Sequence, residues 1–503
     1  MAFRMLSAAA VLLPTFAALL AQEPVIAPAH SYPANLTSVL VADLNSNNAP
    51  EIIGLDNTSN AVVVLKNLGN GKYGPATYYA VSGQPSGIAT GDFNGDGRLD
   101  VAVAFGAYNA AHGKVAVLRG NGDGTLQLPM YYTVSIPADS IAVADFDNDN
   151  RPDIAVIGNT NNNATNTVAI LTNTGSSFTE HSFTAPTYFT ANGFGADADF
   201  IHHVVVGDFN GDRRIDLAYI DECTQCSISS EILFILANTT SGWQAKMPAG
   251  GGGSTSLNAA DIDGDGLSDF VIPFRGCHTP CVGVAVLYMN KNYAVASSQD
   301  LDVLNREDGP TPFQVVVGDF NNDGITDIAG YSAGGTDQNF NQLPLGIMMW
   351  TGAGNRTFHK LKYYDQPNPP AQFSSLYTAA GFLDKNSSRD LVAPAGTETQ
   401  VWLNSTSTAA DPCAYPTSGG IHVCAPSATV PSGKVHFLAS ARTNTQPLNR
   451  IELWIDGQKK IQVFIDRLKV DLAIPNGTHT ASFYEVGASG LHIKKSVTFT
   501  VGN

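Results

Sequence analysis

A nine-residue pattern of acidic and amide residues recurs seven times in this chain and constrains its fold more than any other feature. The second copy reads Asp92-Phe-Asn-Gly-Asp-Gly-Arg-Leu-Asp100, and the apolar residues 101–104 follow it. Repetition at a regular register indicates one supersecondary unit per copy, with connecting loops of variable length. The copies begin at Asp43, Asp92, Asp145, Asp208, Asp261, Asp319 and, in degenerate form, Phe382.

Short strands account for each unit. In the first unit, runs rich in Val, Ile, Leu and Tyr cover residues 38–44, 51–56, 61–66 and 73–81, and turn-forming residues follow each run. The 48 Gly and 27 Pro of the chain fit many strands joined by tight turns. A four-stranded unit buries both faces only when units pack around an axis. We therefore predict an all-β chain with a seven-bladed β-propeller over residues 22–405.

The ends of the repeat array indicate how the ring closes. The seventh unit has candidate strands at residues 390–395 and 400–404 but no fourth strand before Pro412. Residues 24–33 resemble the fourth-strand pattern of residues 73–81. We therefore expect residues 24–33 to complete the seventh blade.

Each of the first six copies places oxygen-bearing side chains at positions 1, 3, 5 and 9, whereas the seventh has Phe382 at position 1. In the second copy these are Asp92, Asn94, Asp96 and Asp100, and Gly97 at position 6 permits a sharp turn. The seven windows hold 21 of the 44 acidic residues, which would repel one another without a cation. Ca²⁺ prefers six to eight oxygen ligands at about 2.3–2.6 Å, so the pattern predicts calcium sites rather than a solvated acidic face.

The seven copies differ in quality, and we expect about five Ca²⁺ ions, in copies two to six. Asn150 and Arg213 replace the glycine in copies three and four, and a left-handed Arg213 would be strained. Copy one is weaker and copy seven is expected to be empty. The expected ligands are Asp92, Asn94, Asp96, Asp100, Asp145, Asp147, Asp149, Asp153, Asp208, Asn210, Asp212, Asp216, Asp261, Asp263, Asp265, Asp269, Asp319, Asn321, Asp323 and Asp327, with Asp43, Asn45, Asn47 and Glu51 as the weaker set.

The repeat resembles a known family. The segments 69–76, 91–104 and 120–125 are similar to FG-GAP/VCBS repeats, the blades of the integrin α-subunit propeller and of many exported bacterial proteins. The resemblance covers residues 24–405. It implies calcium in the loops named above and a role in adhesion or in carbohydrate or protein binding.

The N-terminus and the cysteines indicate export. Residues 1–21 read as a secretory signal peptide; the alternative, a membrane anchor, is disfavoured because Pro14 interrupts a short apolar stretch. We expect a secreted or cell-surface protein with no transmembrane segment in the mature chain. Six cysteines form three close pairs, by default the disulfides Cys223–Cys226, Cys277–Cys281 and Cys413–Cys424. Cross-blade bridges or a four-thiolate zinc site are alternatives for the first two pairs.

The last hundred residues show a different hydrophobic pattern from that of the repeats. Six alternating runs between residues 435 and 501 predict a small β-sandwich over residues 406–503, which resembles bacterial Ig-like domains. Its expected role is that of a spacer or cap.

A ligand would bind on the propeller face opposite the acidic loops. Residues five places before each loop form an expected polar ring that includes Ser38, Ser140 and Ser256, and long loops lie on the same face. A solvated rim without a ligand is the alternative. The candidate ligand-binding residues are His202, His203, Gln314, Tyr377, Asp139, Tyr108 and Phe340.

The sequence favours a binding function over catalysis. No GxSxG, HExxH or P-loop motif is present, and no catalytic residue is assigned. The net charge of −17 argues against a nucleic-acid partner. We expect an adhesion or binding module with an extracellular glycan or protein ligand. The alternatives are a polysaccharide lyase or hydrolase and a structural cell-surface component.

Overall fold

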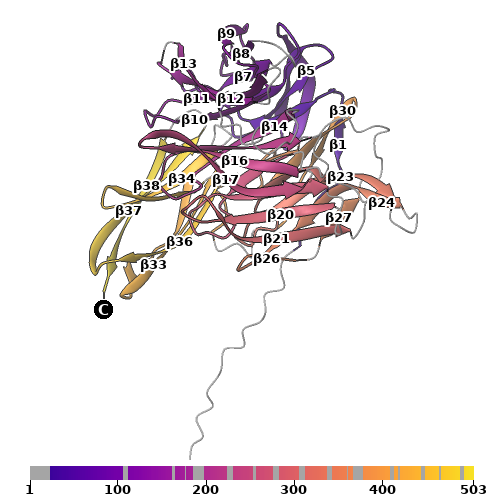
Figure 1. The fold of residues 1–503 in the computed structure, drawn as a ribbon. Coiled ribbons are helices and arrows are strands. Elements are labelled where there is room, and N and C mark those ends of the chain that lie inside the picture. The colour runs from indigo at the N-terminus through magenta and orange to yellow at the C-terminus, as the bar shows by residue number, and fades with distance from the viewer. Residues whose placement is uncertain are drawn as a thin grey trace, which may run out of the picture.

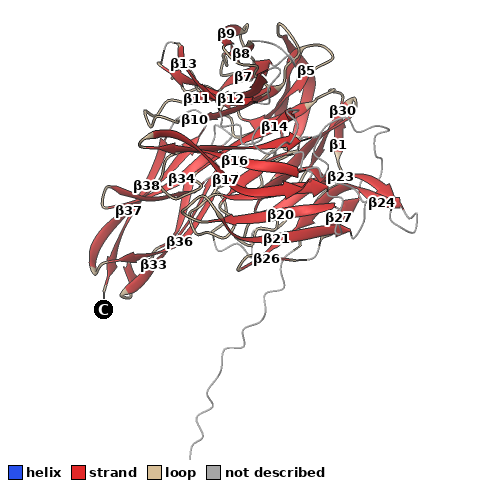
Figure 2. Ribbon diagram, viewed as in Figure 1, coloured by secondary structure: helices blue, strands red, loops and turns tan. Residues whose placement is uncertain are grey.

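The computed structural model describes residues 23–502 apart from 106–111, 161–164, 176, 185–197, 224–229, 253–255, 276–281, 305–311, 337–341, 360, 366–377, 408–412, 417–419, 443–447, 464–465 and 488–491. The described residues form strands and no helix (Figure 2). Within them, therefore, no helix has the length and apolar character to cross a membrane. The predicted signal peptide lies outside the described residues.

Seven four-stranded antiparallel sheets contain the repeats (Figure 1). Each of the first five sheets takes four consecutive strands. The first two sheets are β2 (Ser38–Ala42), β3 (Glu51–Asp56), β4 (Ala61–Gly69) and β5 (Lys72–Ala80), then β6 (Gly87–Gly91), β7 (Asp100–Phe105), β8 (Gly113–Leu118) and β9 (Met130–Val134). The third and fourth are β10 (Ser140–Ala144), β11 (Asp153–Thr160), β12 (Thr165–Asn173) and β13 (Phe178–Thr184), then β14 (Ala198–Gly207), β15 (Asp216–Cys223), β16 (Ser230–Thr239) and β17 (Gly242–Gly252).

The fifth sheet completes this series, and the last two sheets depart from it. The fifth holds β18 (Asn258–Ala260), β19 (Asp269–Arg275), β20 (Val282–Met289) and β21 (Val295–Leu304). The sixth holds β22 (Pro312–Gly318), β23 (Asp327–Thr336), β24 (Gln342–Trp350) and β27 (Lys362–Asp365), with the hairpin of β25 (Gly352–Gly354) and β26 (Thr357–Phe358) before its last strand. The seventh joins β28 (Ala379–Gly381), β29 (Asp390–Ala395) and β30 (Glu398–Trp402) to the N-terminal β1 (His30–Tyr32).

The sheets form a closed ring. Their first strands contact one another in the order β2, β6, β10, β14, β18, β22 and β28, and β28 contacts β2. The antiparallel pairing of β1 with β30 sets His30 opposite Val401 and Tyr32 opposite Thr399. The two ends of the repeat array therefore meet in one sheet.

Apolar side chains fill the space between neighbouring sheets. Leu55 and Val64 of the first sheet pack against Val101 and Val103 of the second in one buried cluster. Both faces of β3 and β7 are buried, which is why residues 52–55 and 101–104 read as continuous apolar runs rather than alternating ones.

A two-sheet sandwich follows the ring. One sheet holds β31 (Gly420–Ala425), β33 (Gly433–Arg442) and β36 (Arg467–Ile474). The other holds β32 (Thr429–Val430), β38 (His492–Val501), β37 (Gly477–Gly487), β34 (Leu448–Ile455) and β35 (Gln458–Val463), and Phe437, Phe483 and Phe499 are buried between the two. The six predicted strands are present. Sequence reasoning missed β31 because Ile421 is its one buried residue, so it shows no apolar alternation.

Candidate metal sites

The seven acidic segments are loops that join the first and second strands of the seven sheets. We call them loop one (43–51), loop two (92–100), loop three (145–153), loop four (208–216), loop five (261–269), loop six (319–327) and loop seven (382–390). In all seven loops position 1 directly follows the first strand, and position 9 begins the second strand. The repeat therefore places seven equivalent loops around one face of the ring.

The carboxylate at position 1 organises its loop through main-chain donors. In loop two, Asp92 Oδ1 accepts hydrogen bonds from the N–H groups of Gly95 (2.8 Å) and Asp96 (3.1 Å), and Oδ2 accepts one from Gly97 (2.7 Å). Asp261 makes the same three contacts in loop five. This pattern curls the loop around the first carboxylate.

Two positions in each of the first six loops adopt left-handed backbone conformations. Position 6 was predicted from its glycine, and Gly97 has φ of 80°. Arg213, which takes this place in loop four, has φ of 71°, so the predicted strain at this residue is present. Position 4 was not predicted, although Gly95 (φ 72°) and Asn148 (φ 62°) show that it obeys the same requirement. Its signal was the recurrence of Gly, Asn or Ser at that place.

The carboxylate at position 9 is buried and ties the loop to the sheet. Asp100 Oδ2 accepts the Phe93 N–H (3.1 Å) and Oδ1 accepts the Gly120 N–H (2.9 Å). Burial raises the pKa of Asp100 to about 7. Burial also raises the pKa of Asp269 to about 9, and the negative charge of Asp261 adds to the shift. These carboxylates need compensating positive charge to stay ionised at neutral pH.

The oxygen positions of two loops fit a hard cation. Ligand atoms of Asp145, Asp147 and Asp153 in loop three lie within 4.8 Å of one another. The same holds for Asp261, Asp263 and Asp265 in loop five. Two oxygens on opposite sides of a calcium ion are about 4.6–5.2 Å apart, so this spacing suits Ca²⁺. Oxygen ligands without His or Cys also disfavour the softer transition metals.

Loops one and seven carry the least complete sets of predicted ligands. In loop one, Glu51 Oε1 accepts the side-chain amide of Asn45 (2.7 Å), and burial raises the pKa of Glu51 to about 7. In loop seven, buried Phe382 packs edge-on against Tyr415, with ring centroids 5.0 Å apart. An aromatic ring therefore stands where the other loops place their first carboxylate.

The structure describes only part of the predicted ligand surface. Ser38, Ser140 and Ser256 are buried, so they do not form the solvent-facing ring that we expected. Gln314 is half-buried and its Oε1 accepts the Thr378 N–H (2.5 Å), and Asp139 is also half-buried. His202 and His203 belong to β14, but their side chains lie outside the described residues, as do Tyr108, Phe340 and Tyr377.

One predicted disulfide is present: Cys413 is bonded to Cys424. Cys223 ends β15, with its side chain outside the described residues. Cys226, Cys277 and Cys281 also lie outside them.

Sequence reasoning missed a set of asparagines that link neighbouring sheets. Asn173 Nδ2 donates to the carbonyl of Phe93 (3.0 Å), which follows the first carboxylate of the preceding loop two. Three other asparagines make the equivalent bond across a sheet boundary. They are Asn67 to Leu383, Asn238 to Phe146 and Asn404 to Phe320. The available signal was an Asn at or near the end of the third strand in each of these four units.

Comparison with known proteins supports the repeat assignment. The sequence matches the FG-GAP-like repeat over residues 43–103, 104–156 and 145–219. No curated protein sequence matches the chain significantly.

Three solved structures illustrate what the fold resembles. BBS1N in complex with ARL6DN has 10% sequence identity and a TM-score of 0.45, covering 77% of this chain and 98% of that chain. The rhamnogalacturonan lyase YesW has 12% identity and a TM-score of 0.32, with coverage of 75% and 90%. The lectin of Aleuria aurantia in complex with alpha-methyl-L-fucoside has 11% identity and a TM-score of 0.36, with coverage of 67% and 99%.

The repeat match and the closed ring of four-stranded sheets agree with each other. Residues 43–219 of this chain are therefore FG-GAP-like repeats, and they build sheets of a β-propeller.

Proposed function

We propose that this protein is an exported, calcium-stabilised propeller of seven blades with a C-terminal Ig-like domain, and that it acts as a non-catalytic adhesion module. Its ligand is an extracellular glycan or protein. The observation that carries the calcium proposal is the recurrence of buried carboxylates in equivalent loops, because burial raises the pKa of Asp153 to about 7 and that of Asp216 to about 8. A divalent cation removes the electrostatic cost of keeping such groups ionised.

The binding proposal follows from the sequence resemblance and from the face on which the loops lie. The acidic loops occupy one face, which leaves the opposite face for a ligand. His203 and Tyr377 are the candidate contacts there, together with His202, Gln314, Asp139, Tyr108 and Phe340. Residues 1–21 are the proposed export signal.

Calcium is tested by unfolding the protein with and without a chelator. Each ion that binds only the folded loop adds about 2.7 kcal/mol to the free energy of unfolding when the free ion concentration is a hundred times Kd. We expect chelation to lower Tm, calcium to restore it, and magnesium to restore less. An unchanged Tm after chelation would refute the calcium proposal.

Ligand binding is tested on a glycan array with calcium present. The wild type is compared with His203→Ala and Tyr377→Ala, and with Asp300→Asn as an exposed control. Binding by the wild type and the control but by neither variant supports a glycan-binding face. Release of reducing ends or unsaturated sugars from polysaccharides would instead establish an enzyme.

A further inference from the structure

The C-terminal sandwich packs against the acidic loops. Gln462 Nε2 lies 3.5 Å from Asp208 Oδ2 of loop four. The guanidinium of Arg442 donates to the carbonyls of Asn386 (2.8 Å) and Asp384 (3.1 Å) in loop seven. The loop face of the ring therefore has a partner within the same chain.

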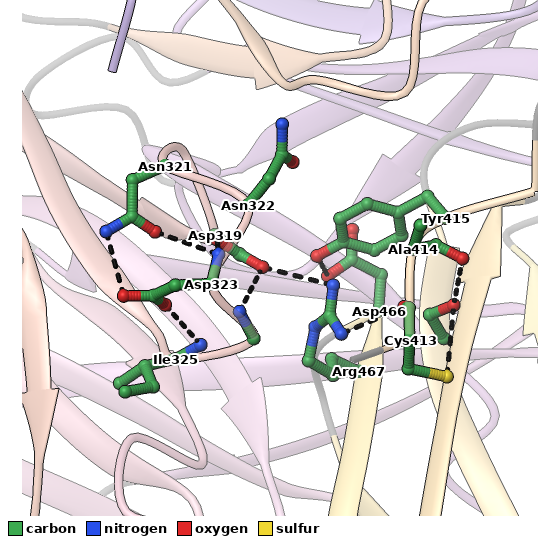
Figure 3. A network of polar contacts seen from close by, with 12 residues as sticks. Asp319, Asn321, Asn322, Asp323, Ile325, Cys413, Ala414, Tyr415, Asp466 and Arg467 are labelled. Carbon is green, nitrogen blue, oxygen red and sulfur yellow. Dashed lines mark hydrogen bonds and ion pairs between the residues drawn. The ribbon is translucent and has the colours of Figure 1, made fainter. Parts of the chain in front are cut away.

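Loop six receives an arginine from this sandwich (Figure 3). Arg467 begins β36, and its Nη2 lies 3.0 Å from Oδ2 of Asp319, the position 1 carboxylate. The same oxygen accepts the Gly324 N–H (2.9 Å). The side chains of Arg467 and Asp319 are only 6% and 3% exposed, so water screens this ion pair little.

The guanidinium is fixed by groups other than Asp319. Arg467 Nη1 donates to the carbonyl of Cys413 (2.9 Å), and the guanidinium stands 4.7 Å from the centroid of the Tyr415 ring. Cys413 is itself bonded to Cys424 of β31. Arg467 is therefore held in place from the sandwich side.

A second ion pair lies beside the first. Asp466 accepts the hydroxyl of Tyr415 (3.0 Å) and pairs with Arg389 of loop seven. Figure 3 shows Asp466 and Tyr415 next to Arg467, at the boundary between the sandwich and loop six. The sandwich therefore contributes an arginine and an aspartate, at neighbouring positions, to ion pairs with loops six and seven.

Arginines near two other loops are placed differently. Arg356 pairs with Asp263 of loop five (2.5 Å) and is 38% exposed, and Arg151 pairs with Asp149 of loop three and is 45% exposed. Neither pairs with a position 1 carboxylate. An exposed arginine turns into solvent at little cost, whereas Arg467 is enclosed.

We propose that Arg467 is the built-in cation of loop six, so that this loop docks the C-terminal sandwich and holds no calcium. An ion bound to Asp319 at about 2.3–2.6 Å would lie within about 5.6 Å of the guanidinium, in a site with little water to screen the repulsion. Asp319, Asn321, Asp323 and Asp327 then leave the set of calcium ligands. The expected number of calcium ions rests on the proposed function, whereas the ion pair between Arg467 and Asp319 does not.

The first test counts bound calcium. Asp319→Asn and its matched equivalent in loop five, Asp261→Asn, are dialysed against calcium, and the ions per chain are measured by atomic emission. We expect Asp261→Asn to lose one ion relative to the wild type and Asp319→Asn to lose none. A loss of one ion from Asp319→Asn would overturn the proposal.

The second test measures coupling between the two residues. Urea unfolding midpoints are compared for Asp319→Asn, Arg467→Met and the double variant, with exposed Lys469→Met as the control partner. We expect the urea midpoint of the double variant to match that of the more destabilised single variant. The midpoint shifts of Asp319→Asn and Lys469→Met, in contrast, should add. Additive shifts for Asp319 and Arg467 would overturn the proposal. If Asp261→Asn also loses no ion, the calcium proposal fails, and this coupling still decides the role of Arg467.

Discussion

The side-chain amide of Asn238 donates a hydrogen bond of 2.8 Å to the carbonyl of Phe146, 92 residues earlier in the chain. The same amide group donates to the carbonyl of Ile215 (3.2 Å). Phe146 belongs to loop three, whereas Asn238 lies in β16 of the fourth sheet. One buried amide therefore ties an acidic loop to the next sheet of the ring.

Asn238→Ala should destabilise the protein by about 2 kcal/mol, because it leaves two buried carbonyls without this donor. Urea unfolding monitored by tryptophan fluorescence measures the change. Asn292→Ala, at an exposed asparagine, is the control and should alter stability by less than about 0.5 kcal/mol. Equal effects from the two substitutions would show that the link between sheets contributes nothing.

Arg213→Gly should stabilise the protein. A side chain in the left-handed region costs about 1–2 kcal/mol, and the added flexibility of glycine in the unfolded chain offsets about 0.5–1 kcal/mol of that gain. We expect a net gain of about 0.5–1 kcal/mol in the free energy of unfolding. Arg213→Ala is the matched control, since alanine removes the charge but keeps the Cβ. A gain in both variants would assign the effect to charge rather than to the backbone.

The sequence predicted the parts of this molecule that repeat. The apolar runs and turn residues located the strands of the first unit to within a few residues, because the same local chemistry recurs in every unit. The loop positions that need a left-handed residue were found at position 6 for the same reason. The regular recurrence of the pattern was enough to locate these strands and loop positions, and no long-range contact had to be known.

The contacts between unlike parts of the chain were not predictable in this way. Arg467 and Asp319 belong to modules with different patterns, and nothing in the segment 467–470 marks an arginine that enters a loop of the ring. The buried state of Ser38 and Ser140 depends on how closely neighbouring sheets approach near the axis. Both facts are set by packing of whole modules rather than by local sequence.

Stability should depend on pH through Glu452 of the sandwich. Burial alone would raise the pKa of this carboxyl, but Arg450 (2.7 Å) and Lys459 (2.9 Å) outweigh burial and lower the pKa to about 2. A lowered pKa in the folded state gives stability that is complete above the unfolded value, near 4.5, and is lost as the pH falls toward 2. The shift corresponds to about 3 kcal/mol.

Glu452→Gln isolates this contribution from those of other carboxyls. The difference in unfolding free energy between the wild type and this variant should be largest at pH 7 and should shrink steadily between pH 4.5 and pH 2. Asp300→Asn, at an exposed carboxyl, should show no such trend. A difference that is constant with pH would mean that Glu452 contributes through packing and not through its charge.

Removal of residues 23–33 should open the ring. The deletion removes β1 and the flanking bonds from Ala27 N–H to the Leu403 carbonyl (2.8 Å) and from Ser405 N–H to the Val25 carbonyl (2.9 Å). At about 1 kcal/mol for each hydrogen bond, the loss is several kcal/mol. The freed edge of β30 should also promote aggregation. We expect a lower Tm and a less cooperative transition by calorimetry, both corrected by adding a synthetic peptide of residues 23–33.

Val25→Ala, at a side chain that is 55% exposed, should leave Tm nearly unchanged. A deletion variant that melts like the wild type would show that pairing of the two chain ends does not hold the ring closed.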